Sequence, residues 1–390
     1  MVFPIWIPFE NEWWTCTLIF CTIIILVIGS EILYNNHLIS PESNRRLVHF
    51  IVGALVAISP LIFHSHIQPL TLSFIFIIFN IIALKYEKFK GIHSLKRITY
   101  GTIYFPISYM IIIFGFWDYP EFIIISFSVF GFADPFAAQI GTNNPSFSRF
   151  IIWEDIKTYQ GTIAFFSSAF FIIYTLGHFL LDYSNNYLFL FSLFVSIFAT
   201  IAEITSSKGS DNLTIPIISI LFMIGYFEII PENIDNIYDL FLNGKFILLL
   251  SIIILFIISY YLSALTISGL FGGIIMGAII IMYGTLNHLI PLGVFFILSS
   301  ILSKVLKSAS FYRTKGSQRD IIQVYANGGI ALSICIINYF NPNSLYIYLF
   351  LSSVAAAMSD TWATEFGKLS KIKPISIITI KPIDHGLSGG

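Results

Sequence analysis

The sequence predicts an all-α fold, a polytopic transmembrane helical bundle of about 13 spans arranged as two fused membrane domains. Of its 390 residues, 56% are hydrophobic and only 11% are charged, against roughly 25% charged in an ordinary soluble domain. Apolar runs of about 18–22 residues follow one another, and each is long enough to cross the hydrocarbon core as a helix. Such unbroken runs lack the alternating pattern of a transmembrane barrel.

Each predicted span is an apolar run between two polar segments. The first run is too long for a typical signal peptide and has no basic residues before it, so we expect a retained helix. The thirteen spans are 15–33, 48–65, 67–84, 98–117, 121–141, 161–181, 186–204, 213–230, 246–262, 264–284, 289–306, 320–340 and 345–360.

The connecting segments separate by charge. When they are assigned alternately to two sides, one side with its span ends carries all of the 20 Lys and Arg residues except Lys245. The positive-inside rule makes this side cytoplasmic and puts the N-terminus outside, in the cytoplasmic membrane. The acidic, Asn-rich segment Pro231–Lys245 is the predicted boundary between a domain over 1–235 and a domain over 243–390.

Asp134 is the first candidate site residue, because ionisable groups at membrane depth are costly and are functional candidates by default. It lies near the predicted cytoplasmic end of the fifth span, and Pro135 after it should break or kink the helix. One or two carboxylates usually hold Mg²⁺ in phosphoryl transfer, so Asp134 is a candidate metal ligand. The alternative is an acid that reaches water at a kinked helix end.

Lys157–Thr162 is a polar loop at the start of the sixth span. Gly161 permits close backbone approach to a ligand, Thr158 and Thr162 offer hydroxyls, and a helix N-terminus favours phosphate. Lys157 adds a positive charge for the same group. No GxxxxGK[ST] pattern is present, so this is not a P-loop. Ordinary capping with a basic flank is the alternative.

Glu203 ends the seventh span, and a Gly/Ser turn after it contains Lys208, Asp211 and Asn212. These residue types suit contacts with a nucleotide or a metal, and a plain turn with an N-cap is the alternative. Arg97 closes a further predicted cytoplasmic end and is a candidate phosphate contact.

Together these segments resemble the dolichol kinase/phytol kinase family of CTP-using polyprenol kinases, over roughly residues 40–220. The resemblance rests on Asn44–His49, Lys96–Thr102, Phe132–Gly141, Lys157–Thr162 and Glu203–Pro216. It implies phosphoryl transfer from CTP or another nucleoside triphosphate to a phytol- or polyprenol-type alcohol.

The resemblance also implies roles for single residues. Catalytic residues would be Asp134, Lys157, Glu203 and Asp211, with Mg²⁺ on Asp134, Glu203 and Asp211. Nucleotide and phosphate contacts would be Arg97, Thr158, Gln160, Gly161, Thr162, Lys208 and Asn212. Gln160 stands where the family commonly has Glu, so it is assigned as a contact and not as an acid.

A second polar set lies in the C-terminal part. Gln323 and Asn327 are spaced i, i+4 and share one helix face. Asp360, Thr364 and Glu365 fall within an arc of roughly 140° at the end of the last predicted span. Two carboxylates on one face are candidate Mg²⁺ ligands, and a polar helix end that meets water is the alternative.

Residues from about 260 to 390 resemble the phytyl-phosphate kinase family, largely uncharacterised membrane proteins known as DUF92. The resemblance rests on Arg319–Val324, Asn327–Gly329, Ser359–Gly367 and Gly386–Gly390. It implies phosphorylation of the lipid monophosphate to the diphosphate, and because members continue past the final Gly-Gly it predicts that this domain is truncated. The implied second site comprises Arg319, Gln323, Asn327, Asp360, Thr364 and Glu365, with metal on Asp360 and Glu365.

The sequence therefore predicts a two-step, CTP-dependent lipid-alcohol kinase whose partners are a nucleotide, an isoprenoid alcohol and its phosphate, and membrane lipid, with no nucleic acid. One alternative is a CTP-dependent phosphatidate cytidylyltransferase, whose long signature of basic and acidic residues is not found. The other is a transporter, for which midplane polar residues and inverted repeats would be typical. Here the polar groups gather at one predicted face.

Overall fold

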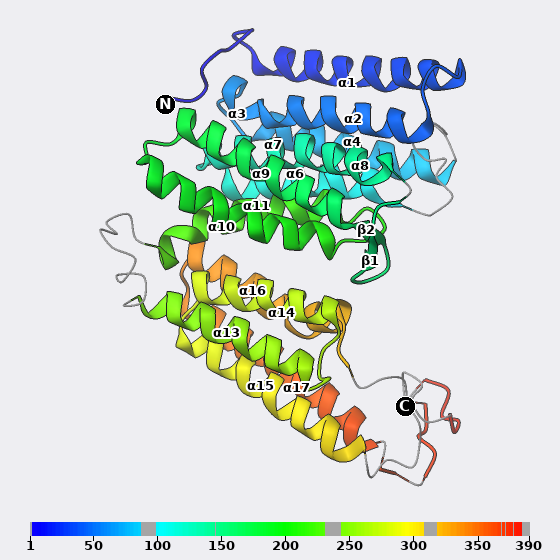
Figure 1. Ribbon diagram of the computed structural model, residues 1–390, viewed down its shortest axis with the longest axis vertical. Coiled ribbons are helices and arrows are strands. Elements are labelled where there is room, and N and C mark those ends of the chain that lie inside the picture. The colour runs from blue at the N-terminus through cyan, green and yellow to red at the C-terminus, as the bar shows by residue number, and fades with distance from the viewer. Residues whose placement is uncertain are drawn as a thin grey trace. The chain divides into compact units, whose positions relative to one another are not determined.

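The structure is a computed structural model that describes residues 2–86, 99–144, 146–230, 243–307, 318–367, 369–370, 372–376 and 378–383. Arg97, the segment 231–242 and Gly386–Gly390 lie outside the described residues. The chain divides into two compact units, Met1–Phe227 and Glu228–Gly390. Helices dominate both units (Figure 1), so the predicted all-α membrane bundle is confirmed.

Unit 1 contains a bundle of helices whose axes run side by side, with one small hairpin (Figure 1). The last helix of the unit continues two residues past its boundary. The elements are α1 (Glu12–Asn35), α2 (Pro41–Ala57), α3 (Ser59–Ile62), α4 (Ile67–Lys85), α6 (Gly101–Phe116), α7 (Pro120–Ser128), η1 (Val129–Ala133), α8 (Asp134–Asn143), β1 (Arg149–Ile151), β2 (Ile156–Thr158), α9 (Tyr159–Leu180), α10 (Asn185–Ile204) and α11 (Asp211–Ile229).

Unit 2 is a smaller helical bundle in which α14 packs on α13 and α16, while α17 packs on α15 and α16. Its helices are α13 (Gly244–Tyr261), α14 (Ile267–Tyr283), α15 (Leu286–Lys307), α16 (Ile321–Phe340) and α17 (Ser344–Gly367). Between α13 and α14, Leu265 forms a single parallel bridge with Arg319, which anchors the start of α16 to the start of α14.

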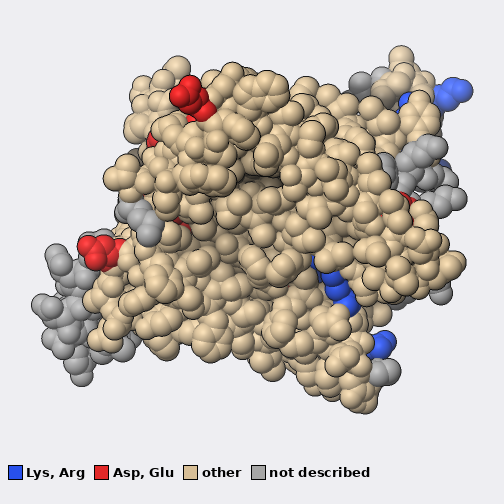
Figure 2. All heavy atoms as spheres, turned by 90° about the horizontal axis from the view of Figure 1, so that it is seen from above, with Lys and Arg blue, Asp and Glu red and all other residues tan. Residues whose placement is uncertain are grey.

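Nine helices in the described part of the chain are long and apolar enough to cross a membrane. The other four predicted spans also fall on helices: α6 and α14, which are apolar but shorter, α2, whose first turns are charged, and α17, whose last turns are polar. One face of the molecule shows mainly uncharged residues with few Lys, Arg, Asp and Glu side chains (Figure 2). This is the composition expected of an integral membrane protein.

Helix α2 begins seven residues before the predicted span 48–65. Ser40 caps it by accepting a hydrogen bond from the backbone N–H of Ser43 at 3.1 Å, and Pro41 occupies the first turn, where a missing N–H costs nothing. Residues 44–47 therefore lie on a helix and not, as was predicted for them, in a connecting segment. Their polar side chains project into the bundle from fixed helical positions.

Pro135 was predicted to break or kink the helix that carries Asp134; the helix does not break there, and its irregularity is a π-helical turn. A π-helical turn, Val129–Ala133, precedes Asp134, and Pro135 fits in the first turn of α8. The wider π turn accommodates the proline ring where a regular α-helix would clash with it, and π turns are frequent at functional sites.

Helices α2 and η1 touch through their backbones at two glycines. A Cβ built on Gly53 would lie 2.7 Å from the Cα of Gly131, and one built on Gly131 would lie 3.1 Å from the Cα of Gly53. Gly141 of α8 and Gly161 of α9 approach in the same way, because a Cβ on Gly161 would lie 3.3 Å from the Cα of Gly141. Small residues at such crossings let membrane helices pack closely.

We expect Gly53→Ala to destabilise unit 1 by about 1–3 kcal/mol, because the added methyl group would push against backbone that cannot rotate away. Gly29→Ala in α1 is the matched control, since a Cβ there meets nothing within 4 Å. It should be neutral or slightly stabilising. Thermal unfolding of both variants in detergent tests this, and equal midpoints would show that the contact does not constrain the fold.

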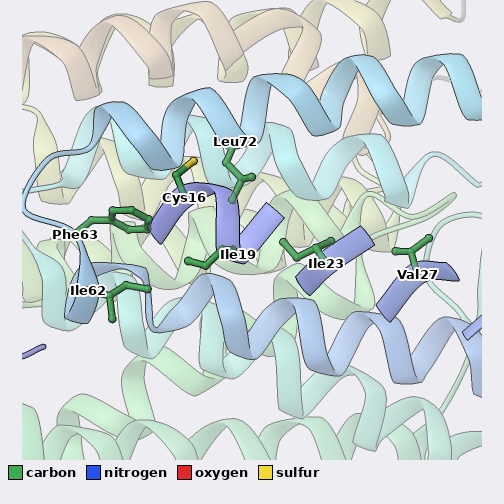
Figure 3. Packing of buried hydrophobic residues seen from close by; sticks show 7 residues of the cluster. All are labelled: Cys16, Ile19, Ile23, Val27, Ile62, Phe63 and Leu72. Carbon is green, nitrogen blue, oxygen red and sulfur yellow. The ribbon is translucent and has the colours of Figure 1, made fainter. Parts of the chain in front are cut away.

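Helix α1 packs on the bundle through an apolar stripe. Cys16, Ile19, Ile23 and Val27 are spaced along one face of α1 and meet Ile62, Phe63 and Leu72 (Figure 3). The Cys16 thiol donates a weak hydrogen bond to the carbonyl of Gln68, 3.7 Å away. The end of this stripe, Ile23 and Val27, also lines a cavity described below.

The predicted polar loop Lys157–Thr162 is divided between two elements. Strand β2 pairs antiparallel with β1, so that Phe150 lies opposite Lys157, and α9 then begins at Tyr159. Thr158 caps α9 by accepting a hydrogen bond from the N–H of Gly161 at 3.1 Å. Its hydroxyl is therefore engaged in the helix start, as the capping alternative predicted.

Candidate functional site

A cavity in unit 1 is lined by a group of ionisable side chains and, elsewhere, by mainly apolar side chains with a few uncharged polar ones, such as Ser73 and Asn80. Its volume is about 150 Å³. The polar end is lined by Arg45, Arg46, His49, Asp134, Asp211 and Asn212. The apolar part is lined by residues of α1, α2, α4 and α6, which include Ile23, Val56, Leu72, Phe76 and Phe105. This division matches a lipid with a small polar head.

Asp134 lies at the polar end opposite His49. The His49 Nδ1 atom is 3.9 Å from Oδ2 of Asp134, and its Nε2 atom is 3.1 Å from the carbonyl oxygen of Phe130. The imidazole ring also lies against the Phe130 ring, with centroids 4.1 Å apart. The side chain of His49 is thus fixed by its neighbours at the edge of the cavity.

Arg46 joins α2 to α8 by hydrogen bonds to neutral groups. Its guanidinium donates to Oε1 of Gln139, to the carbonyl of Ala138 at 3.2 Å and to the hydroxyl of Thr142 at 2.9 Å. Its Nε atom is buried and has no partner among the described residues. None of these contacts neutralises the guanidinium, so its positive charge remains available to an anion at the cavity mouth.

Lys157 and Glu203 form a nearly buried ion pair. The Lys157 ammonium donates to Oε1 of Glu203 at 2.5 Å, and the two side chains are 17% and 10% exposed. Burial by itself would lower the pKa of Lys157, but the charges of Glu203, Asp211 and Asp134 outweigh burial and raise the pKa above its usual value. Three carboxylates from three helices therefore surround one ammonium.

The turn between α10 and α11 carries Asp211 and Asn212 to the cavity. Lys208 and Gly209 have left-handed backbone, with φ of 51° and 87°, and Gly209 also lies so close to Gly101 that a Cβ would meet its nitrogen at 2.5 Å. The Asn212 amide donates to the carbonyl of Gly209 at 3.0 Å and to Oδ1 of Asp211 at 2.7 Å. These contacts fix both side chains at the mouth.

Lys208 itself points to the surface. Its ammonium pairs with Glu154 at 2.8 Å, its backbone N–H donates to Asp155 at 3.3 Å, and its carbonyl accepts from the N–H of Tyr100 at 2.9 Å. The hydrogen bond and charge of Glu154 raise the pKa of Lys208. Lys208 thus ties the turn to the β1–β2 hairpin and to the start of α6.

Several buried polar atoms near these groups have no hydrogen-bond partner among the described residues. Such atoms are costly unless a ligand or water satisfies them. They are Nδ2 and Oδ1 of the fully buried Asn44, Oγ1 of Thr102, Oε1 of Gln160, Oγ1 of Thr162, Oε2 of Glu203 and Oγ of Ser207. Thr102 lines the cavity and Glu203 pairs with Lys157, so at least these two unpaired oxygens belong to the candidate site and could contact a polar ligand.

Unit 2 has a smaller, mainly apolar cavity between α13, α14, α15 and α16. Arg319, Gln323 and Asn327 line it together. Burial lowers the pKa of Arg319, which Glu365 partly offsets, and the guanidinium lies 5.9 Å from the centroid of the Phe295 ring. Its Nη2 atom is buried without a partner among the described residues. Such a cation favours an anionic ligand.

The polar end of α17 does not line that cavity. Glu365 accepts a hydrogen bond from the Ser303 hydroxyl at 2.9 Å, while Asp360 and Thr364 are exposed. The structure thus brings Arg319, Gln323 and Asn327 together, with Glu365 within electrostatic range of Arg319. It does not place Asp360 or Thr364 on the same cavity.

In unit 1 the structure brings together Asp134, Lys157, Glu203 and Asp211 from segments up to 77 residues apart in sequence. Gly161 is at a helix crossing and Thr158 caps α9 with its hydroxyl, so both have a structural part at the start of α9. Sequence reasoning did not select Asn44 and His49 as site residues. The signal was present: Ser40-Pro41 is a helix start, and it places both residues on a helix face.

No group of three or more His, Cys, Asp or Glu side chains that could hold a metal occurs among the described residues. Mg²⁺ in nucleotide sites usually needs only one or two carboxylates, with phosphate oxygens and water as the remaining ligands. Asp134 and Asp211, which both line the cavity, fit that smaller donor set. The predicted site with Glu203 as a third ligand does not form among the described residues.

Comparisons with known proteins support the membrane assignment. Residues 250–390 match the family described as integral membrane protein DUF92. An uncharacterized membrane protein of Methanocaldococcus jannaschii is 36% identical over 122 residues, which cover 31% of this chain and 51% of that protein. Protein PGR of Arabidopsis thaliana is 31% identical over 115 residues, which cover 25% of this chain and 40% of that protein.

The chain thus spans about half the length or less of these curated relatives. No solved structure matches. The C-terminal resemblance to the DUF92 family agrees with the prediction, while the resemblance of the N-terminal part to polyprenol kinases stays a prediction. The chain is an integral membrane protein.

Proposed function

We propose that unit 1 is an isoprenoid-alcohol kinase that transfers a phosphoryl group from CTP, or another nucleoside triphosphate, to a phytol- or polyprenol-type alcohol at the cytoplasmic face of the membrane. The observation that carries the proposal is the cavity with carboxylates and arginines at one end and apolar side chains along the rest. A long-chain alcohol likewise has a polar hydroxyl at one end and an apolar chain along the rest of its length. Its hydroxyl would lie between Asp134 and Asp211, and its chain among the apolar residues.

The reaction requires one bond to form and one to break. The alcohol oxygen attacks the γ-phosphorus, the bond from that phosphorus to the β–γ bridging oxygen breaks, and the nucleoside diphosphate leaves. The alcohol proton passes to a carboxylate at the cavity mouth, either Asp134 or Asp211. Little covalent chemistry is asked of the protein, so positioning and charge neutralisation supply most of the catalysis.

The positive side chains supply that neutralisation. Arg45 and Arg46 line the cavity mouth, and Lys157 lies near the same carboxylates. Gln160 and Thr162 offer partner-free polar atoms in the first turn of α9, where a helix N-terminus favours phosphate. Asp134 and Asp211, which both line the cavity, would hold Mg²⁺, which when bound supplies positive charge to the nucleotide phosphates.

For unit 2 we propose a second phosphoryl transfer, onto the lipid monophosphate. The guanidinium of Arg319, whose Nη2 atom has no partner among the described residues, lines the cavity with Gln323 and Asn327. It suits the phosphate of a lipid whose chain lies in the apolar cavity. Glu365, which lies within electrostatic range of Arg319, would contribute a carboxylate to Mg²⁺. Two sites on one chain would raise the effective concentration of the monophosphate for the second step.

Product analysis on the purified full-length protein tests the proposal. The protein in detergent receives Mg²⁺, a nucleoside triphosphate and phytol, farnesol or geranylgeraniol, and the lipid phosphates, nucleoside diphosphate and pyrophosphate are followed. We expect lipid monophosphate with an equal amount of nucleoside diphosphate, then lipid diphosphate, and a loss of both when a chelator removes Mg²⁺.

Other products would contradict the proposal. Pyrophosphate release on phosphatidate would indicate a cytidylyltransferase. No turnover of any nucleotide would exclude the kinase and favour transport.

A further inference from the structure

His49 has one ring nitrogen committed to the backbone. Its Nε2 atom lies 3.1 Å from the carbonyl oxygen of Phe130. A carbonyl oxygen can only accept, so Nε2 must carry the hydrogen and donate it. In the neutral ring, Nδ1 is then the nitrogen with the free lone pair.

The π turn explains why the carbonyl of Phe130 needs this donor. In a π-helical turn the N–H of residue i+5 donates to the carbonyl of residue i. The fifth residue after Phe130 is Pro135, which has no N–H. Buried backbone carbonyls are nearly always paired, and His49 supplies the missing donor. The tautomer of His49 is therefore set by the sequence at Pro135.

The Nδ1 atom is left at the cavity. Its nearest described acid, Oδ2 of Asp134, is 3.9 Å away, which is too far for a hydrogen bond. Two acids and two arginines line the same mouth, so their charges largely offset one another. The His49 side chain is 14% exposed and its ring lies against the rings of Phe105 and Phe130, a setting that favours the uncharged imidazole. A neutral His49 therefore presents a hydrogen-bond acceptor next to a carboxylate that is also an acceptor.

We propose that Nδ1 of His49 accepts the hydrogen bond of the substrate hydroxyl, and so selects a neutral lipid alcohol over lipids that lack an O–H donor. The inference rests on the proposed function and names the group that recognises its substrate. An alcohol satisfies the lone pair, whereas an ether leaves it unpaired and a phosphate monoester brings further negative charge to Asp134 and Asp211. Because Asp134 lies beside Nδ1, the hydroxyl hydrogen can turn to that carboxylate as the phosphorus–oxygen bond forms.

Nitrogen NMR of the imidazole tests the recognition without any turnover. The full-length protein, labelled with ¹⁵N in its 8 histidines, is placed in lipid nanodiscs, and His49 is assigned from the signals missing in His49→Gln. We expect one hydrogen-bearing nitrogen and one bare nitrogen, and the bare signal should shift when phytol is added without nucleotide. Phytyl methyl ether, which has no donor, should leave it unshifted. A hydrogen on Nδ1, or no shift on saturation with phytol, would overturn the proposal.

Selectivity gives a second readout. Wild type should bind phytol about 10- to 100-fold more tightly than its methyl ether, as expected when a buried acceptor is left unpaired. His49→Phe should lose this preference, and His49→Gln, whose amide oxygen can accept, should keep part of it. His64→Gln is the control, because His64 is exposed and outside the cavity lining.

The two proposals fail separately. Absence of kinase activity with the expected NMR shift would refute the proposed function and leave an alcohol-binding site. Kinase activity with an unchanged alcohol preference in His49→Phe would refute the role of His49 alone.

Discussion

Asp134→Asn should lower lipid-alcohol phosphorylation by about 10²–10³-fold, the usual loss when one group that stabilises transition-state charge is removed. The amide keeps the volume and the helix but removes the negative charge that faces Asp211 and Lys157. Asp211→Asn should have a similar effect. If the two carboxylates act as a unit, the double variant should retain as much phosphorylation activity as the less active of the two single variants.

The measurement is initial rate on purified protein at saturating nucleotide, with the melting temperature recorded for each variant. Asp118→Asn is the matched control, because Asp118 is an exposed acid outside the cavity lining. Activity of Asp134→Asn within a few-fold of wild type, in a normally folded protein, would remove this carboxylate from the reaction.

Glu203→Gln should destabilise unit 1 by about 3–5 kcal/mol, because it leaves the ammonium of Lys157 without its closest carboxylate in a nearly water-free position. The double variant Lys157→Met, Glu203→Gln should recover part of that loss, since neither charge then remains. Both variants should lack kinase activity. Chemical unfolding in a mild detergent measures the cycle.

The pair Glu228–Lys245 in unit 2 is the comparison. Its groups lie 2.6 Å apart, but their side chains are 32% and 34% exposed. Water screens such a pair, so we expect Glu228→Gln to cost less than Glu203→Gln. If the two substitutions lower the free energy of unfolding equally, or if Glu203→Gln does not lower it, burial does not determine how much stability is lost when the Lys157 pair is broken.

Much of the fold follows from sequence because length and apolarity decide which segments can cross a bilayer. The starts of helices were harder. The predicted span at 48–65 followed the apolar run and passed over Ser40-Pro41, so Asn44 was placed in a connecting segment although it lies on α2. The hairpin of β1 and β2 has only three residues in each strand, too few for any alternation to be recognised.

The candidate site divides in the same way. Asp134, Glu203 and Lys157 stand out in the sequence because charge is rare in this chain, and the structure brings them together. The contact of His49 with Phe130 could not be predicted from the sequence, because it depends on a π-helical turn and no residue pattern predicts such a turn. In the second unit, separation of Asp360 from the cavity depends on the rotation of α17 about its own axis, which spacing alone does not fix.

The two glycine crossings have a consequence for the accuracy of the polar groups. Gly53 and Gly131 meet four residues after His49 and three residues before Asp134, and Gly141 and Gly161 meet beside Gln160 and Thr162. Main chain rests directly on main chain at both places, so no side-chain rotamer separates the helices. The spread in position of a donor or acceptor then comes almost wholly from its own χ angles. Relative motion of the packed helices adds little to it. The polar groups of the candidate site therefore keep their relative positions without a large network of hydrogen bonds.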